Sequence, residues 1–137
     1  MMKAIKKLSG PKTLFVVGLV YAFIITVAFL SSAAVVPKVN IPYLDKVFHA
    51  LIHCVLSFIW LWFAFSIDKR HIAGKAVIVV LVLCFSYGIA IEVAQDWFTA
   101  SREFDLLDVL ANGVGGVLGF LSFDKVKCKM VNRNSNS

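Results

Sequence analysis

Four long apolar runs alternate with short polar segments along this chain. They cover about residues 14–36, 46–67, 76–95 and 106–123. Each run is close to the ~20 residues that an α-helix needs to cross the hydrocarbon core of a bilayer. The pattern predicts an all-α integral membrane protein with four transmembrane helices.

The composition supports this prediction, and the basic residues at both ends of the chain indicate segments outside the membrane domain. Hydrophobic residues make up 60% of the chain, above the roughly 45 to 50% of soluble domains. A basic N-terminus (1–12) should precede one membrane domain (13–123), and a basic, partly disordered tail (124–137) should follow it. The net charge is +6, and the lysine and arginine residues flank the apolar runs. They form no basic patch with exposed aromatic residues, so nucleic acid is not an expected partner.

Lysine and arginine are distributed unevenly among the connecting segments. Eleven of the 14 lie in the N-terminus, in the turn after the second run and in the tail, whereas Lys38, Lys46 and Arg102 lie in the other two connectors. The positive-inside rule then predicts that both termini are cytoplasmic. The expected location of the protein is the cytoplasmic membrane of the cell. In an alternative interpretation, the first run is a cleaved signal peptide ending near Ser31-Ser32-Ala33, although the run is long for that role.

Polar residues gather where the last three runs meet the outer face. Five of the eight acidic residues lie between Glu92 and Asp108. Residues three or four apart share a helix face, which relates Asp45 to His49 and Asp105 to Asp108. Runs two and four begin outside and run three ends there, so their polar stripes should converge in one outward-facing pocket. Its expected ligand-binding residues are Asp45, His49, Glu92, Gln95, Arg102, Asp105, Asp108 and Asn112.

Simpler roles are open for several of these residues. Asp45 and Asp105 are each suited to cap the start of a helix, and Asp108 is suited to interact with the helix dipole. His53, one turn deeper than His49, is interpreted as a hydrogen-bonded interior histidine. Residues that are expected to be solvated are Lys46, Asp96 and Glu103.

Glu92 is the hardest residue to explain structurally, because a carboxylate inside an apolar run needs a cation, hydrogen-bond donors or a proton. Arg102 is the nearest candidate cation and His49 is the next. Glu92, His49 and Asp108 are the candidate catalytic residues, since neighbouring groups of separable pKa can act as acid and base. Carboxylates and imidazole also bind metals, but no compact HExxH motif specifies one, and neither a metal nor a cofactor is assigned.

Three short motifs resemble those of VanZ-like membrane proteins, a family named after a teicoplanin-resistance protein. Asp45–His49 resembles the family's DKxxH, Glu92–Gln95 resembles its ExxQ, and Arg102–Asn112, with Gly116 after it, resembles its RxxDxxDxxxN. The match covers about residues 45–123. It implies a multi-pass membrane protein in which these polar residues matter, with an association with the cell envelope and glycopeptide resistance.

The leading hypothesis is a protein of the lipid bilayer that binds or modifies a cell-envelope component. A lipid-linked envelope component and a glycopeptide are the candidate partners, and teicoplanin susceptibility is the associated phenotype. A second hypothesis is a metal-dependent or acid–base hydrolase or transferase acting on a lipid-linked headgroup. A third, weaker one is a small proton-linked transporter or assembly subunit, because intramembrane carboxylates also serve proton relays. Whether the protein is an enzyme is therefore left open.

Small residues in the fourth run predict close helix packing. Gly115 and Gly119 have the GxxxG spacing that lets the backbone of a neighbouring membrane helix approach. The favoured interpretation is packing among the four helices of one chain. Homo-oligomerisation through the same two glycines is the alternative.

Reporter fusions test the predicted topology. A reporter fused after Ser66 should lie in the cytoplasm, and one fused after Thr99 should lie outside, because the charge asymmetry places the two connectors on opposite sides. Paired fluorescent-protein and alkaline-phosphatase fusions at each position provide the measurement. If both positions reported the same side, the four-span topology would be wrong.

Overall fold

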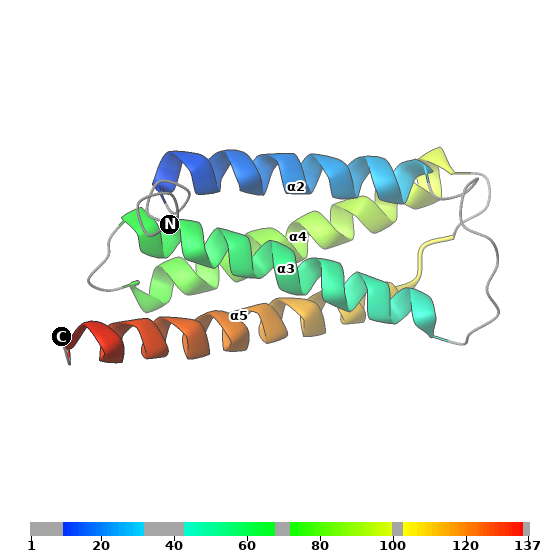
Figure 1. Cartoon of the computed structure of the whole chain (residues 1–137). Coiled ribbons are helices and arrows are strands. Elements are labelled where there is room, and N and C mark those ends of the chain that lie inside the picture. The colour runs from blue at the N-terminus through cyan, green and yellow to red at the C-terminus, as the bar shows by residue number, and fades with distance from the viewer. Residues whose placement is uncertain (1–9, 32–42, 68–71, 100–102, 136–137) are drawn as a thin grey trace.

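The computed structural model describes residues 10–31, 43–67, 72–99 and 103–135. Within these ranges it has no strand, and its helices are α2 (Pro11–Ser31), α3 (Leu44–Ile67), α4 (Gly74–Phe98) and α5 (Leu106–Ser135) (Figure 1). All four are long and apolar enough to cross a membrane. The predicted all-α architecture with four spans is confirmed.

The helix limits differ from the predicted spans mainly at the C-terminus. The sequence predicts a partly disordered tail from residue 124, but α5 continues through Ser135. An ion pair of 2.9 Å joins Asp124 to Lys127 one turn later, and the Lys127 ammonium lies 5.7 Å from the centre of the Phe123 ring. Such contacts between side chains three or four residues apart stabilise an α-helix. Residues 32–36, the predicted end of the first span, lie outside the described ranges.

Successive helices run antiparallel (Figure 1). α2 and α4 begin at the end of the bundle where α3 and α5 finish, and α3 and α5 begin at the other end, where α4 finishes. The first turns of α3 and α5 and the last turns of α4 are therefore brought to the same end. These are the segments that carry most of the predicted pocket residues.

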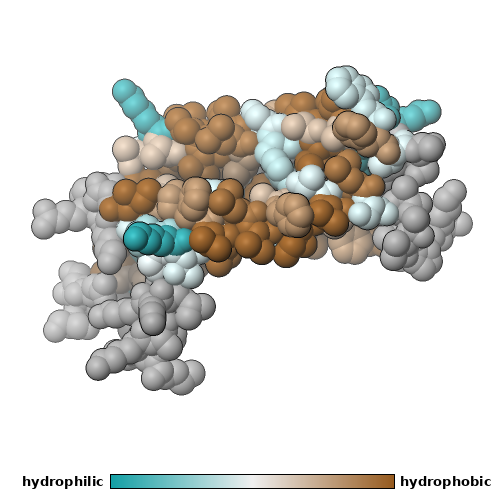
Figure 2. Space-filling view, turned by 90° about the horizontal axis from the view of Figure 1, so that it is seen from above, coloured by the Kyte–Doolittle hydropathy of each residue, from teal (hydrophilic) through white to brown (hydrophobic). Residues whose placement is uncertain are grey.

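The outer surface of the bundle is apolar. Large hydrophobic side chains are exposed on every helix, among them Phe23, Leu51, Leu83 and Leu118. Figure 2 shows apolar surface along one face of the bundle, with the most hydrophilic residues toward its ends. Soluble monomers rarely expose such extended apolar surface. These side chains therefore face the lipid bilayer.

Close contact between α3 and α5 depends on two glycines. A Cβ atom at Gly115 would overlap the carbonyl oxygen of Ala50, and one at Gly119 would lie 2.5 Å from the carbonyl oxygen of Cys54. Only a residue without a side chain allows this backbone approach. The contact agrees with the favoured interpretation of packing within one chain. Homo-oligomerisation through the same two glycines stays a prediction.

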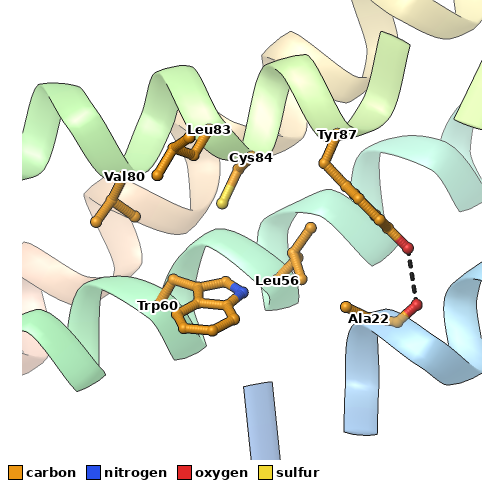
Figure 3. A pocket seen from close by; sticks show the side chains of 7 residues that line it. All are labelled: Ala22, Leu56, Trp60, Val80, Leu83, Cys84 and Tyr87. Carbon is orange, nitrogen blue, oxygen red and sulfur yellow. Dashed lines mark hydrogen bonds between the residues drawn. The ribbon is translucent and has the colours of Figure 1, made fainter. Parts of the chain in front are cut away.

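An apolar cavity of about 240 Å³ lies between α2, α3 and α4 (Figure 3). The hydroxyl of Tyr87 donates a hydrogen bond of 2.7 Å to the carbonyl oxygen of Ala22, so the most polar group at its edge is satisfied. None of the predicted pocket residues contributes to the lining, which consists of Ala22, Leu56, Trp60, Val80, Leu83, Cys84 and Tyr87. The cavity is thus a gap in the apolar part of the bundle and separate from the polar residues.

Substitution of Gly119 tests the α3–α5 contact. Gly119→Ala should destabilise the protein by about 1–3 kcal/mol, because the added methyl group must push α3 away. The matched control is Gly74→Ala, since a Cβ at Gly74 meets no atom within 4 Å. Thermal unfolding in detergent measures both variants. Equal melting temperatures for the two would show that the helices tolerate a larger separation.

Candidate functional site

Ionisable side chains from three helices meet at the end of the bundle where α3 and α5 begin. We call this group the polar cluster. It joins the first turns of α3 and α5 to the last turns of α4 through contacts of 2.5 to 3.9 Å. Its members are Asp45, Lys46, His49, Glu92, Asp105, Asp108 and Asn112.

Lys46 is the cation that holds α3 and α5 together within the cluster. Its Nζ atom lies 2.5 Å from Oδ2 of Asp105, 2.8 Å from Oδ1 of Asp108 and 3.8 Å from Oδ2 of Asp45. The Asp108 side chain is only 5% exposed, so this carboxylate needs a charged partner. The expectation that Lys46 is solvated is therefore wrong. Its ammonium group is held between acidic residues of two helices.

The imidazole of His49 lies on the inner side of the cluster, away from the end of the bundle, and is fully buried. Its Nδ1 atom is 3.2 Å from Oε1 of Glu92 and 3.2 Å from Oδ1 of Asn112. An amide oxygen can only accept a hydrogen bond, so the contact with Asn112 places a hydrogen on Nδ1. The other ring nitrogen, Nε2, faces Oδ1 of Asp45 at 3.8 Å and Oδ2 of Asp108 at 3.9 Å.

Exposure decreases from the end of the bundle inward. The side chains of Asp45 and Asp105 are 42% and 40% exposed, whereas those of His49 and Glu92 are 0% and 2% exposed. The polar cluster is therefore accessible from the end of the bundle and closed below.

Asp105 serves both the helix and the cluster. Its Oδ1 atom accepts a hydrogen bond of 2.8 Å from the backbone N–H of Leu107, which caps the start of α5. Its Oδ2 atom contacts Lys46. The hydrogen bond from the Lys46 ammonium, together with that from Leu107, lowers the pKa of Asp105 below its ordinary value. One oxygen of this carboxylate thus caps α5, and the other forms the ion pair with Lys46.

The chain matches the family model VanZ/LLP1 over residues 4–127, nearly its whole length. It belongs to the VanZ/LLP1 family. No curated protein and no solved structure matches it. The family match and the four apolar helices together describe a multi-pass membrane protein.

Within this VanZ/LLP1 protein, most of the predicted pocket residues come together in the polar cluster, but Gln95 contacts α2 instead. Gln95 is buried, and its Nε2 atom donates a hydrogen bond of 3.1 Å to the carbonyl oxygen of Phe29. The ring of Phe29 packs against the imidazole of His49, with 4.5 Å between ring centres. Gln95 therefore fixes the aromatic ring that covers His49, and it acts on the cluster indirectly.

Arg102, the first candidate partner of Glu92, lies outside the described residues. The second candidate, His49, is the partner found 3.2 Å from the Glu92 carboxylate. The other two residues expected to be solvated, Asp96 and Glu103, are both exposed. Oδ1 of Asp96 also accepts a hydrogen bond of 3.2 Å from the backbone N–H of Phe104. This bond ties the last turn of α4 to the segment that leads into α5.

His53 continues the polar face of α3 below His49. It is buried, but neither ring nitrogen has a hydrogen-bond partner among the described residues, so the interpretation as a hydrogen-bonded interior histidine is not what the structure shows. Its ring packs closely over Gly88. A Cβ there would lie 2.8 Å from Cε1 of His53 and 2.9 Å from Nδ2 of Asn112. Gly88 thus lets α4 approach both side chains.

Lys46 is the cluster residue that sequence reasoning missed. Its position three residues before His49 places both on one face of α3, and this spacing was available in the sequence. Lysine at the end of an apolar run is usually interpreted as a topology signal. Only the approach of α5 shows that Lys46 is enclosed by carboxylates.

Removal of the Lys46 ammonium tests its structural importance. Lys46→Met should lower the free energy of unfolding by about 2 kcal/mol, because Asp105 and the buried Asp108 lose their shared cation. The matched control is Lys127→Met, which breaks a pair with the more exposed Asp124 and should change stability by less than about 1 kcal/mol. Thermal unfolding in detergent compares them. A Lys46→Met protein as stable as the control would contradict the role of Lys46.

Proposed function

We propose that this VanZ/LLP1 protein binds or modifies a cell-envelope component at the polar cluster and thereby changes susceptibility to glycopeptides such as teicoplanin. The cluster faces the outside of the cytoplasmic membrane in this proposal, and both termini are cytoplasmic. The asymmetry of lysine and arginine supports this orientation.

The observation that carries the proposal is the depth profile of the cluster. Asp45 and Asp105 are accessible at the end of the bundle, and His49 and Glu92 are buried beneath them. A purely structural ion-pair group would not need a buried histidine and carboxylate beneath an accessible rim, since charge within a membrane is costly. Pockets that bind ligands typically combine an accessible opening with a few fixed polar groups.

A groove between α4 and α5 supports a partner that carries a hydrocarbon chain. The groove has a volume of about 260 Å³, and Asn112 of the polar cluster forms part of its wall. The rest of its lining is apolar or small, because it consists of Leu81, Val82, Cys84, Phe85, Gly113, Gly116 and Val117. A lipid-linked component placed with its headgroup at the cluster would have its chain beside this groove.

The charge of the cluster indicates which headgroups suit it. Among the described residues it contains four carboxylates, those of Asp45, Glu92, Asp105 and Asp108, and one ammonium, that of Lys46. Carboxylates accept hydrogen bonds from hydroxyl and amino groups. The cluster therefore favours a sugar or amine headgroup over one that presents only phosphate.

The contact between His49 and Glu92 favours a second candidate function, acid–base catalysis on the bound headgroup. A buried imidazole and carboxylate 3.2 Å apart can exchange a proton, and general acid–base groups of this kind contribute about 10²- to 10⁴-fold to rates. The protein would then be a hydrolase or transferase. Both candidate functions use the same residues and differ in whether the component is altered.

Complementation in cells tests the proposal. A deletion strain should recover wild-type teicoplanin susceptibility with the native gene but not with Glu92→Gln, His49→Ala or Asp108→Asn, and combined variants should lose no more than single ones. Glu103→Gln is the matched control, because Glu103 is an exposed carboxylate at the same end of the bundle. Minimum inhibitory concentrations provide the measurement, with protein levels checked by immunoblot.

Full complementation by Glu92→Gln and His49→Ala at normal protein level would defeat the shared-site proposal. These residues would then be structural polar contacts. Analysis of envelope lipids from the same strains separates the two candidate functions, since catalysis changes the chemical composition of the component and binding alone does not.

A further inference from the structure

We infer that a divalent metal ion binds at the polar cluster between Asp45, His49 and Asp108. This inference deepens the proposed function, on which it rests, by assigning an ion to the same site. The three residues each offer one ligand atom, and these atoms lie within 4.8 Å of one another. Two carboxylate oxygens and one imidazole nitrogen are a common set of protein metal ligands.

The orientation of His49 is the first argument. Asn112 and Glu92 face its Nδ1 atom at 3.2 Å, so the hydrogen of a neutral imidazole lies on Nδ1 and the lone pair lies on Nε2. Nε2 points between Oδ1 of Asp45 and Oδ2 of Asp108, at 3.8 and 3.9 Å. A histidine that binds a metal through one nitrogen typically donates a hydrogen bond to a carboxylate or carbonyl from the other.

The separate oxygens of the two aspartates are the second argument. Asp45 and Asp108 each direct one oxygen toward Lys46, Oδ2 and Oδ1 respectively. Their other oxygens, Oδ1 and Oδ2, face Nε2 of His49. Lys46 thus leaves the three candidate ligand atoms directed at one another. Three electron-rich atoms in such an arrangement favour a cation between them.

The charge balance is the third argument. Among the described residues, the cluster contains four carboxylates and one ammonium. Such carboxylate-rich surroundings attract a divalent cation. Three protein ligands also leave coordination positions for water or for a hydroxyl of the bound component. Mn²⁺ and Zn²⁺ suit this mixed oxygen and nitrogen set.

Metal binding by the purified protein tests the inference. The full-length chain, with its affinity tag removed, is freed of metal in detergent and titrated with Mn²⁺, with free Mn²⁺ followed by electron paramagnetic resonance. Competition with Zn²⁺ extends the test to the second ion. We expect one ion per chain for the wild type and at least about tenfold weaker binding for Asp45→Asn and Asp108→Asn. Asp124→Asn is the matched control, because Asp124 lies on α5 more than four helical turns after Asp108, and this variant should bind like the wild type.

Two further variants distinguish a metal site from a set of structural ion pairs. Glu92→Gln retains a side chain that can accept from Nδ1 but removes the charge, and it should weaken Mn²⁺ binding about tenfold. Lys46→Met removes the competing ammonium, and it should bind Mn²⁺ about tenfold more tightly even though the protein is less stable. Circular dichroism and gel filtration establish that each variant is folded.

The inference would be overturned if neither Mn²⁺ nor Zn²⁺ bound the folded wild-type protein stoichiometrically. Equal affinities for the wild type and Asp108→Asn would also overturn it. The proposed function would still stand if the cluster variants failed to complement in cells. Conversely, stoichiometric metal binding that is lost in Asp108→Asn would support the metal site. This would hold even if the same variant restored wild-type susceptibility in cells, a result that would count against the proposed function.

Discussion

The approach of α3 to α5 is the contact on which the rest of this protein depends. Gly115 and Gly119 place backbone against backbone, with no side chain to hold the two helices apart. That distance lets Lys46 on α3 reach the two aspartates at the start of α5, and it lets Asn112 reach His49. Two small residues in the first half of α5 thus set the geometry of the polar cluster at the start of that helix.

Low dielectric surroundings explain why the cluster is so extensively paired. A carboxylate such as Asp108, almost fully buried beside hydrocarbon, is stable as an anion only with a cation or several donors nearby. Lys46 serves the outer carboxylates, and His49 connects them to Glu92. Each group is therefore partly balanced by the next.

Residues at the start of α5 and near the end of α4 position the cluster from two sides. Asp105 caps α5 with one oxygen and contacts Lys46 with the other, so the start of the helix and the site are positioned together. On the opposite side, Gln95 holds the carbonyl group of Phe29, and the Phe29 ring covers His49. The end of α2 thereby closes the cluster laterally, while its outer carboxylates stay accessible. The residues that cap or brace the helix ends are thus members of the cluster or their direct neighbours.

The sequence by itself determined the four apolar helices, because a bilayer requires long hydrophobic runs with internally paired backbones and this signal is local. It also determined which helix ends carry Asp45, His49, Glu92, Asp108 and Asn112, since spacing along one helix assigns residues to a face. Only the tertiary structure decided how those faces pair. It enclosed Lys46 between acids of another helix, turned Gln95 toward α2 and placed Gly115 and Gly119 against α3. These outcomes depend on the rotation and separation of packed helices, which residue spacing within a single helix does not specify.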